Sequence, residues 1–166
     1  PFLKQALNHV TNPWDSALNI AQAVNYPLSP FPYPPFMYVF FLPVALLLKT
    51  LSNWPVVLTN LVFKLPTFAA DSAIFFMLRQ IFPKKRGMVL LVYFASPIIL
   101  YSCYMHSQLD LIPTSLLMGA IFLLTRNRLL YSAILLSLAV CAKFHVLATL
   151  PLILIYILKN YSNLTK

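Results

Sequence analysis

Three polar side chains that could bind a sugar or a phosphate lie close together in residues 106–110, HSQLD. His106, Gln108 and Asp110 alternate along this segment, which lies between two apolar runs. A turn here would present hydrogen-bond donors and acceptors together to hydroxyl or phosphate oxygens. The alternative is that Asp110 or Ser107 only caps the next helix. A cap explains one residue and not three, so we predict a binding site.

A second candidate is Lys143, where one apolar run gives way to the next. A lysine ammonium is a compact point charge that can pair with a phosphate, which predicts a substrate-binding role. The alternative is a lysine at a helix end whose stem lies along apolar surface while its charge reaches water. His145, two residues later, is interpreted as an interfacial histidine.

Asp71 lies in the middle of the apolar run 54–78. A charge at the centre of a membrane helix costs roughly 2.5–3.5 kcal/mol on insertion scales, so this carboxylate should face other helices and find a partner. We favour a polar lock between helices over direct contact with substrate. Lys64 is seven residues earlier and two turns away, too far for contact unless Pro66 bends the chain.

Other classes of site have little support in the sequence. Asp15 is the only acid in the polar N-terminal segment, and its context suits a helix N-cap better than a catalytic base. The sequence has no glycine-rich phosphate loop, nucleophile elbow, HExxH or CxxC motif. We predict no metal site and no cofactor from these residues, and leave a divalent metal open.

The elements that must position these residues are apolar helices. Apolar residues make up 60% of the chain and charged residues 9%, against roughly 45–50% and about 25% in soluble domains. The apolar runs approach the roughly 17–25 residues that span a bilayer. This pattern predicts an all-α, polytopic transmembrane helical bundle with a partial extracytoplasmic loop of short juxtamembrane helices. The runs are 36–48, 54–78, 87–104, 108–125, 129–146 and 147–158.

The net charge of +9 comes from basic residues that lie mostly at the ends of apolar runs. This is the pattern of residues that flank membrane helices, so nucleic acid is not expected as a partner. The positive-inside rule places the clusters 79–86 and 126–128, together with Lys159, in the cytoplasm. The turns at 104–108 and 143–147 then face the opposite side of the membrane.

The chain begins at Pro1 and is expected to be an internal fragment. We predict that 1–35 is the end of a first extracytoplasmic loop and 36–52 a juxtamembrane or re-entrant helix. About five transmembrane helices follow over 53–160, and 161–166 begins a cytoplasmic loop. The apolar part of the second segment, about thirteen residues, is below spanning length, and whether it crosses the bilayer is left open.

Four short motifs resemble those of a known enzyme class. They are Tyr33-Pro34-Pro35, Ala70-Asp71, the tyrosine-rich turn with His106 and Gln108, and Lys143 before a second turn. In this order and spacing the chain resembles the polyprenyl-phosphate-sugar-dependent glycosyltransferases of the GT-C superfamily. The pattern is most similar to the dolichyl-phosphate-glucose glucosyltransferases of lipid-linked oligosaccharide assembly and their prokaryotic relatives.

The resemblance implies that a hexose, glucose or mannose, moves with inversion from a polyprenyl-phosphate carrier to an acceptor hydroxyl on the non-cytoplasmic face. The acceptor would be a glycan or a lipid-linked sugar, in a bacterial or archaeal plasma membrane or the endoplasmic reticulum. Tyr33, His106, Gln108, Asp110 and Lys143 would bind substrate, and Asp71, Pro34 and Pro35 would be structural or line the site. The catalytic base is expected upstream of Pro1.

Two other functions are compatible with the same residues. A secondary transporter or channel subunit would use Asp71, Lys143 and His106 as an intramembrane ion or proton path. A non-catalytic scaffold would use them as helix caps and locks. Loss of transfer activity on mutating His106 and Lys143 would separate the enzyme from the scaffold.

Overall fold

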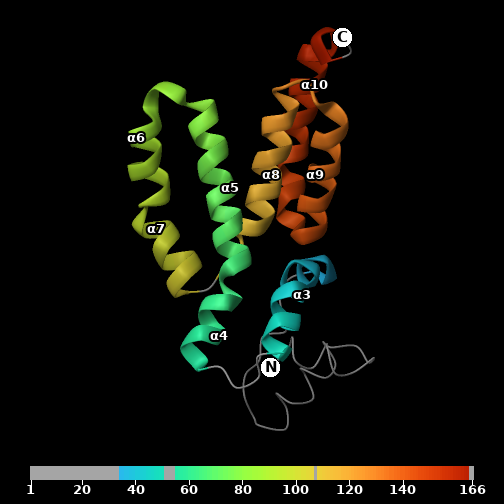
Figure 1. The fold of residues 1–166 in the computed structure, drawn as a ribbon. Helices are drawn as coiled ribbons and strands as arrows, with labels where there is room; N and C mark the ends of the chain where they lie inside the picture. Colours follow the sequence, from blue (N-terminus) through green and yellow to red (C-terminus); the bar gives the residue numbers. More distant parts are fainter. Residues whose placement is uncertain (1–33, 51–54, 107, 165–166) are drawn as a thin grey trace. The chain divides into compact units, whose positions relative to one another are not determined.

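The computed structural model describes residues 34–50, 55–106 and 108–164 (Figure 1). All regular structure in these ranges is helical, with no strand among them. This confirms the predicted all-α class. The chain divides into two compact units, Pro1–Phe63 and Lys64–Lys166, and each is described on its own.

The described part of the first unit consists of α3 (Pro35–Thr50) and α4 (Val56–Phe63). Pro35 begins α3, a position where the missing amide donor of proline is not needed, and the Pro34 carbonyl accepts the first bond, from Met37 N at 3.0 Å. Met37 and Phe41 are fully buried, and the Phe41 ring stacks on Phe63 with centroids 5.0 Å apart. These contacts join α3 to α4.

The second unit begins with α5 (Leu65–Ile81), which carries Asp71. The apolar run predicted at 54–78 is broken, because α4 ends at Phe63 and α5 begins at Leu65. Pro66 explains the break, since its ring and missing N–H fit the first turn of a helix but not an interior.

After α5 the segment Pro83–Met105 runs through η1 (Pro83–Lys85), α6 (Arg86–Val89), η2 (Leu90–Phe94), α7 (Pro97–Ile99) and η3 (Leu100–Met105). Ser96 is extended at the break between η2 and α7, as expected for a residue before proline. Both η2 and η3 are π-helical. Their wider turns bring Ala95 N to Leu90 O at 2.9 Å and His106 N to Tyr101 O at 2.8 Å.

The rest of the unit is a helical hairpin and a closing helix: α8 (Leu111–Leu124), α9 (Leu129–Ala142), η4 (Phe144–Thr149) and α10 (Leu150–Leu164). The buried Ser132 hydroxyl donates to Ala120 O at 2.7 Å and joins α8 to α9. Gly119 allows the close approach, since a Cβ there would lie 2.9 Å from Leu135 Cδ1. Asn127, with a positive φ of 59°, turns the chain between the two helices.

The turns of the second unit lie at its two ends (Figure 1). The α5–α6 turn, the α8–α9 turn and the end of α10 lie at one end, and the start of α8 and the α9–α10 connection lie at the other. The Arg126 guanidinium donates to Gln80 Oε1 at 3.0 Å, which joins the first two turns. The basic clusters predicted to share one side of a membrane therefore share one end of this unit.

Length and composition single out one segment in the described ranges, Pro83–Met105, as able to cross a membrane. Val57–Phe63 and Leu65–Ile81 pass the same test only when counted together as a broken span. The other apolar helices, Phe36–Thr50, Leu111–Leu124, Leu129–Ala142 and Phe144–Asn160, are shorter.

Candidate functional site

The two predicted polar turns meet through an ion pair between Lys143 and Asp110. Lys143 Nζ lies 2.5 Å from Asp110 Oδ1. Lys143 ends α9 in an extended conformation, with φ −160° and ψ 124°, after the buried Ala142. Asp110 immediately precedes α8. The pair thus connects the beginning of α8 to the end of α9, across 33 residues of sequence.

The Asp110 side chain does not cap α8, contrary to the helix-cap interpretation. Asp110 occupies the N-cap position of α8, yet the carboxylate makes no capping hydrogen bond there. The first turn of α8 is supported instead by the Asp110 carbonyl, which accepts from the backbone and hydroxyl of Thr114. The carboxylate is therefore directed to Lys143 and not to its own helix.

His106 and Gln108 lie on the exposed side of the same turn. The His106 ring is nearly parallel to that of Tyr101, at 4° and 6.4 Å between centroids, and both side chains are exposed. Gln108 is also exposed, while its backbone N–H donates to Ser102 O at 2.9 Å. Between Gln108 and Asp110, Leu109 is buried. The segment thus presents three polar side chains around one buried apolar residue.

The exposure of the ion pair matters for its chemistry. The Lys143 and Asp110 side chains are 30% and 40% exposed. A pair this open to solvent is worth only about 0–1 kcal/mol. A phosphate could therefore take the place of Asp110 at the Lys143 ammonium with little loss of stability.

Asp71 forms a separate, buried polar cluster. Its side chain is 1% exposed. Tyr93 Oη donates to Oδ1 and Tyr104 Oη donates to Oδ2, each at 2.8 Å. Lys64 Nζ donates to the backbone carbonyl of Tyr104 and not to Asp71. Both carboxylate oxygens are thus used in bonds between helices, as expected for a polar lock.

Sequence reasoning missed Tyr93 as a partner of Asp71. A signal was present, because Tyr93 and Tyr104 are eleven residues apart and three helical turns return to the same face. The π-helical turns and the break at Ser96 change the course of the segment between them, and both hydroxyls reach one carboxylate. That convergence depends on backbone irregularities that residue spacing does not reveal.

Comparison of the chain with family models, with curated proteins and with solved structures finds no match.

The remaining predicted site residues all belong to the first unit. Pro34 and Pro35 belong to the first unit, where they begin α3. Tyr33 and Asp15 lie outside the described residues. Their roles stay predictions, and the site described here consists of His106, Gln108, Asp110 and Lys143.

The cysteines and possible metal ligands add no further chemistry to this site. Cys103 is buried, and Cys141 lies on the exposed side of α9. No group of three histidine, cysteine or acidic side chains that could hold a metal ion occurs within the described ranges.

Proposed function

We propose that the chain belongs to a multi-pass membrane protein in which the second unit is embedded in a bilayer. The observation that supports this is apolar exposure along the helices. Leu91, Ile98 and Leu158 are each more than 70% exposed, on segments that end in basic turns. Water would disfavour such a surface, whereas lipid would not. The helices of 14 to 17 residues would then be short or tilted spans.

Within that membrane protein we propose a glycosyltransferase that takes a hexose from a polyprenyl-phosphate carrier and transfers it with inversion to an acceptor hydroxyl. The acceptor oxygen bonds to the anomeric carbon from the face opposite the phosphate. The bond between that carbon and the phosphate oxygen breaks, and the phosphate keeps the electron pair. A general base takes the acceptor proton.

In this reaction, residues of this chain would stabilise the phosphate that leaves. The observation that carries it is the Lys143–Asp110 pair at the end of the unit away from the basic clusters. An arriving lipid phosphate would displace Asp110 from the ammonium, and Lys143 would neutralise the charge that grows as the bond breaks. The released Asp110 carboxylate, with Gln108, would then accept hydrogen bonds from sugar hydroxyls.

His106 would position the donor from the exposed side of the turn. Its ring lies nearly parallel to that of Tyr101, and its side chain is exposed. An edge nitrogen can donate a hydrogen bond to a phosphate oxygen. His106 and Lys143 would then contact the same group from two segments of the chain.

The test is transfer activity of the full-length protein in vesicles, with a polyprenyl-phosphate hexose as donor. Removing a single charge-stabilising donor costs roughly 10²–10³-fold in rate, so Lys143→Gln should lower kcat/KM for the donor by about that factor. Lys143→Arg should keep part of the activity. The matched control is Lys159→Gln, which removes a lysine at the other end of the unit and should have little effect. Equal activity of Lys143→Gln and the control would refute the proposal.

A further inference from the structure

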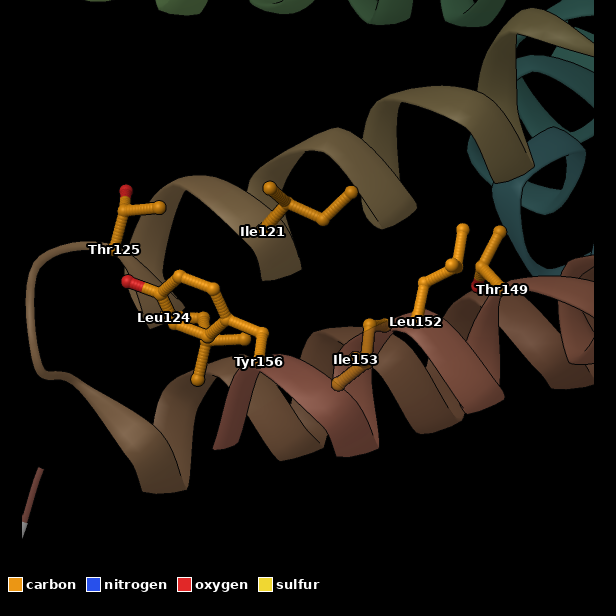
Figure 2. Close-up of a pocket in the computed structure, with 7 residues that line it drawn as sticks. All are labelled: Ile121, Leu124, Thr125, Thr149, Leu152, Ile153 and Tyr156. Atoms are coloured by element: carbon orange, nitrogen blue, oxygen red, sulfur yellow. The ribbon is translucent and has the colours of Figure 1, made fainter. Parts of the chain in front are cut away.

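An apolar groove between α8 and α10 has no role in the proposed transfer. It encloses about 200 Å³. Its lining is Ile121, Leu124, Thr125, Thr149, Leu152, Ile153 and Tyr156 (Figure 2). Pockets for drug-sized molecules measure roughly 300–1,000 Å³, so this groove is better matched to a single hydrocarbon chain.

The groove follows from the residue spacing on the two helices. Thr149, Leu152, Ile153 and Tyr156 lie at intervals of three and four residues and so share one face. Leu124 and Ile153 are buried and form the floor, while Leu152, 70% exposed, forms a rim. The groove is therefore lined along its length and open on one side.

The two threonines do not make the groove polar. Thr125 Oγ1 donates to Phe122 O at 2.9 Å, and Thr149 Oγ1 donates to Val146 O at 2.7 Å. Each hydroxyl is satisfied by a carbonyl of its own segment. An occupant would gain from apolar contact here and would have no hydrogen bond to replace.

The polarity changes at one end of the groove. Figure 2 shows the Tyr156 hydroxyl near Thr125, at the end where α8 gives way to the turn toward α9. Arg128 follows Thr125 by three residues, and Lys159 follows Tyr156 by three residues, and both cations are exposed. Arg126, in the same turn, packs over the Phe122 ring with its guanidinium carbon 4.2 Å from the centroid. The groove is therefore apolar along its length, and two exposed cations follow its lining residues in the sequence at this end.

We propose that this groove binds an anionic phospholipid, with one acyl chain between α8 and α10 and its phosphate at Arg128 and Lys159. The argument for this occupant is charge complementarity, because a lipid without net negative charge would compensate the two cations less well and an apolar helix would not compensate them at all. From Tyr156 in α10 to Thr149 at the end of η4 the groove extends for about 10 Å, within the roughly 15 Å of hydrocarbon in one leaflet. Anionic lipids are concentrated in the cytoplasmic leaflet, where the positive-inside rule puts this end.

The inference rests on the membrane location in the proposed function, but not on glycosyl transfer. Its test uses the full-length protein in phosphatidylcholine vesicles that contain phosphatidylglycerol with a photoreactive acyl chain. After illumination, adducts are mapped by mass spectrometry. We expect them on Ile121, Leu152 and Tyr156. Labelling should be stronger than with a phosphatidylcholine probe that carries the same photoreactive acyl chain.

Two kinds of variant test binding of the lipid head group and binding of the acyl chain separately. Near an anionic surface each lysine or arginine changes binding by about fivefold, so Arg128→Gln and Lys159→Gln should each weaken labelling by about that factor. Leu152→Trp should abolish labelling by filling the groove. Leu154→Trp places the same ring at an exposed position outside the groove and is the matched control.

The outcomes distinguish this inference from the proposed transfer. Lys143→Gln should leave the adducts unchanged even though it lowers transfer. Equal labelling by both probes, unchanged in Arg128→Gln and Leu152→Trp, would mean ordinary boundary lipid and would overturn the inference. Cross-links from the groove to another polypeptide would overturn it too, since a protein would then cover this face. Failure of the protein to enter vesicles would remove the membrane location and both proposals together.

Discussion

The Tyr104 hydroxyl donates a 2.8 Å hydrogen bond to Asp71 Oδ2 from a residue 33 positions further along the chain. The carbonyl of the same tyrosine accepts Lys64 Nζ. Tyr104 is thereby held at two points, its side chain and its backbone, just before the turn that carries His106. Tyr104 therefore connects the buried Asp71 cluster to the exposed turn that carries His106.

If Asp71 is a polar lock between helices, the free energy of unfolding should depend on its hydrogen bonds to Tyr93 and Tyr104. Tyr93→Phe and Tyr104→Phe should each lower the free energy of unfolding by about 0.5–1.5 kcal/mol. Asp71→Ala should cost more than either, because it leaves two part-buried hydroxyls unpaired. The triple variant should regain part of that loss, since no unpaired partner is left. Unfolding in mixed micelles measures all four, with the exposed Tyr101→Phe as control.

A further variant, Asp71→Asn, separates the lock from an ion path. An ion or proton path through Asp71 would make Asp71→Asn abolish transport while leaving the unfolding free energy almost unchanged. The lock gives the reverse result, a loss of stability without a specific transport defect.

The Lys143–Asp110 pair should contribute little to stability despite its short distance. Both side chains are partly exposed, so Lys143→Ala and Asp110→Ala should each change the free energy of unfolding by about 0–1 kcal/mol. A double-mutant cycle measured in the same micelles gives the coupling between them. A coupling of several kcal/mol would indicate a structural pair, and would count against its exchange with a phosphate.

The two ends of the second unit should be reached by reagents from opposite sides of the membrane. In a background with Cys103→Ser and Cys141→Ser, a cysteine replacing His106 should react with an impermeant maleimide from the non-cytoplasmic side. A cysteine replacing Lys85 should react only after the membrane is made permeable or inverted. Labelling of both from one side would contradict the predicted topology.

Gly119 tests the packing of α8 against α9. Gly119→Ala should be close to neutral, because the atom in its way is the end of the flexible Leu135 side chain and alanine gains about 1 kcal/mol of helix propensity. Gly119→Ile should destabilise by about 1–3 kcal/mol through overpacking. Adding Leu135→Ala should restore part of that loss in the same unfolding assay. If Leu135→Ala restores no stability, contact with Leu135 does not determine which side chains position 119 tolerates.

Much of the fold could be predicted from composition and periodicity. The all-α class, the turn at 106–110, the end of a helix at Lys143 and the burial of Asp71 follow from where charges and prolines interrupt apolar runs. The break at Lys64 was less visible, because Pro66 is equally compatible with a kink and with a helix start. The exposure of Cys141 could not be predicted either, since an apolar helix has no polar face to mark its orientation.

The sequence by itself determined which segments are helical and which polar residues fall in turns, because these depend on local chemistry that each residue carries with it. Only the tertiary structure decided the partners. Asp110 pairs with Lys143, and Asp71 with Tyr93 and Tyr104, through contacts across 22 to 33 residues. Such contacts depend on how helices of nearly uniform hydrophobicity rotate and pack against one another. That rotation is set by small residues such as Gly119 and by π-helical turns, whose effects appear only once the chain is folded.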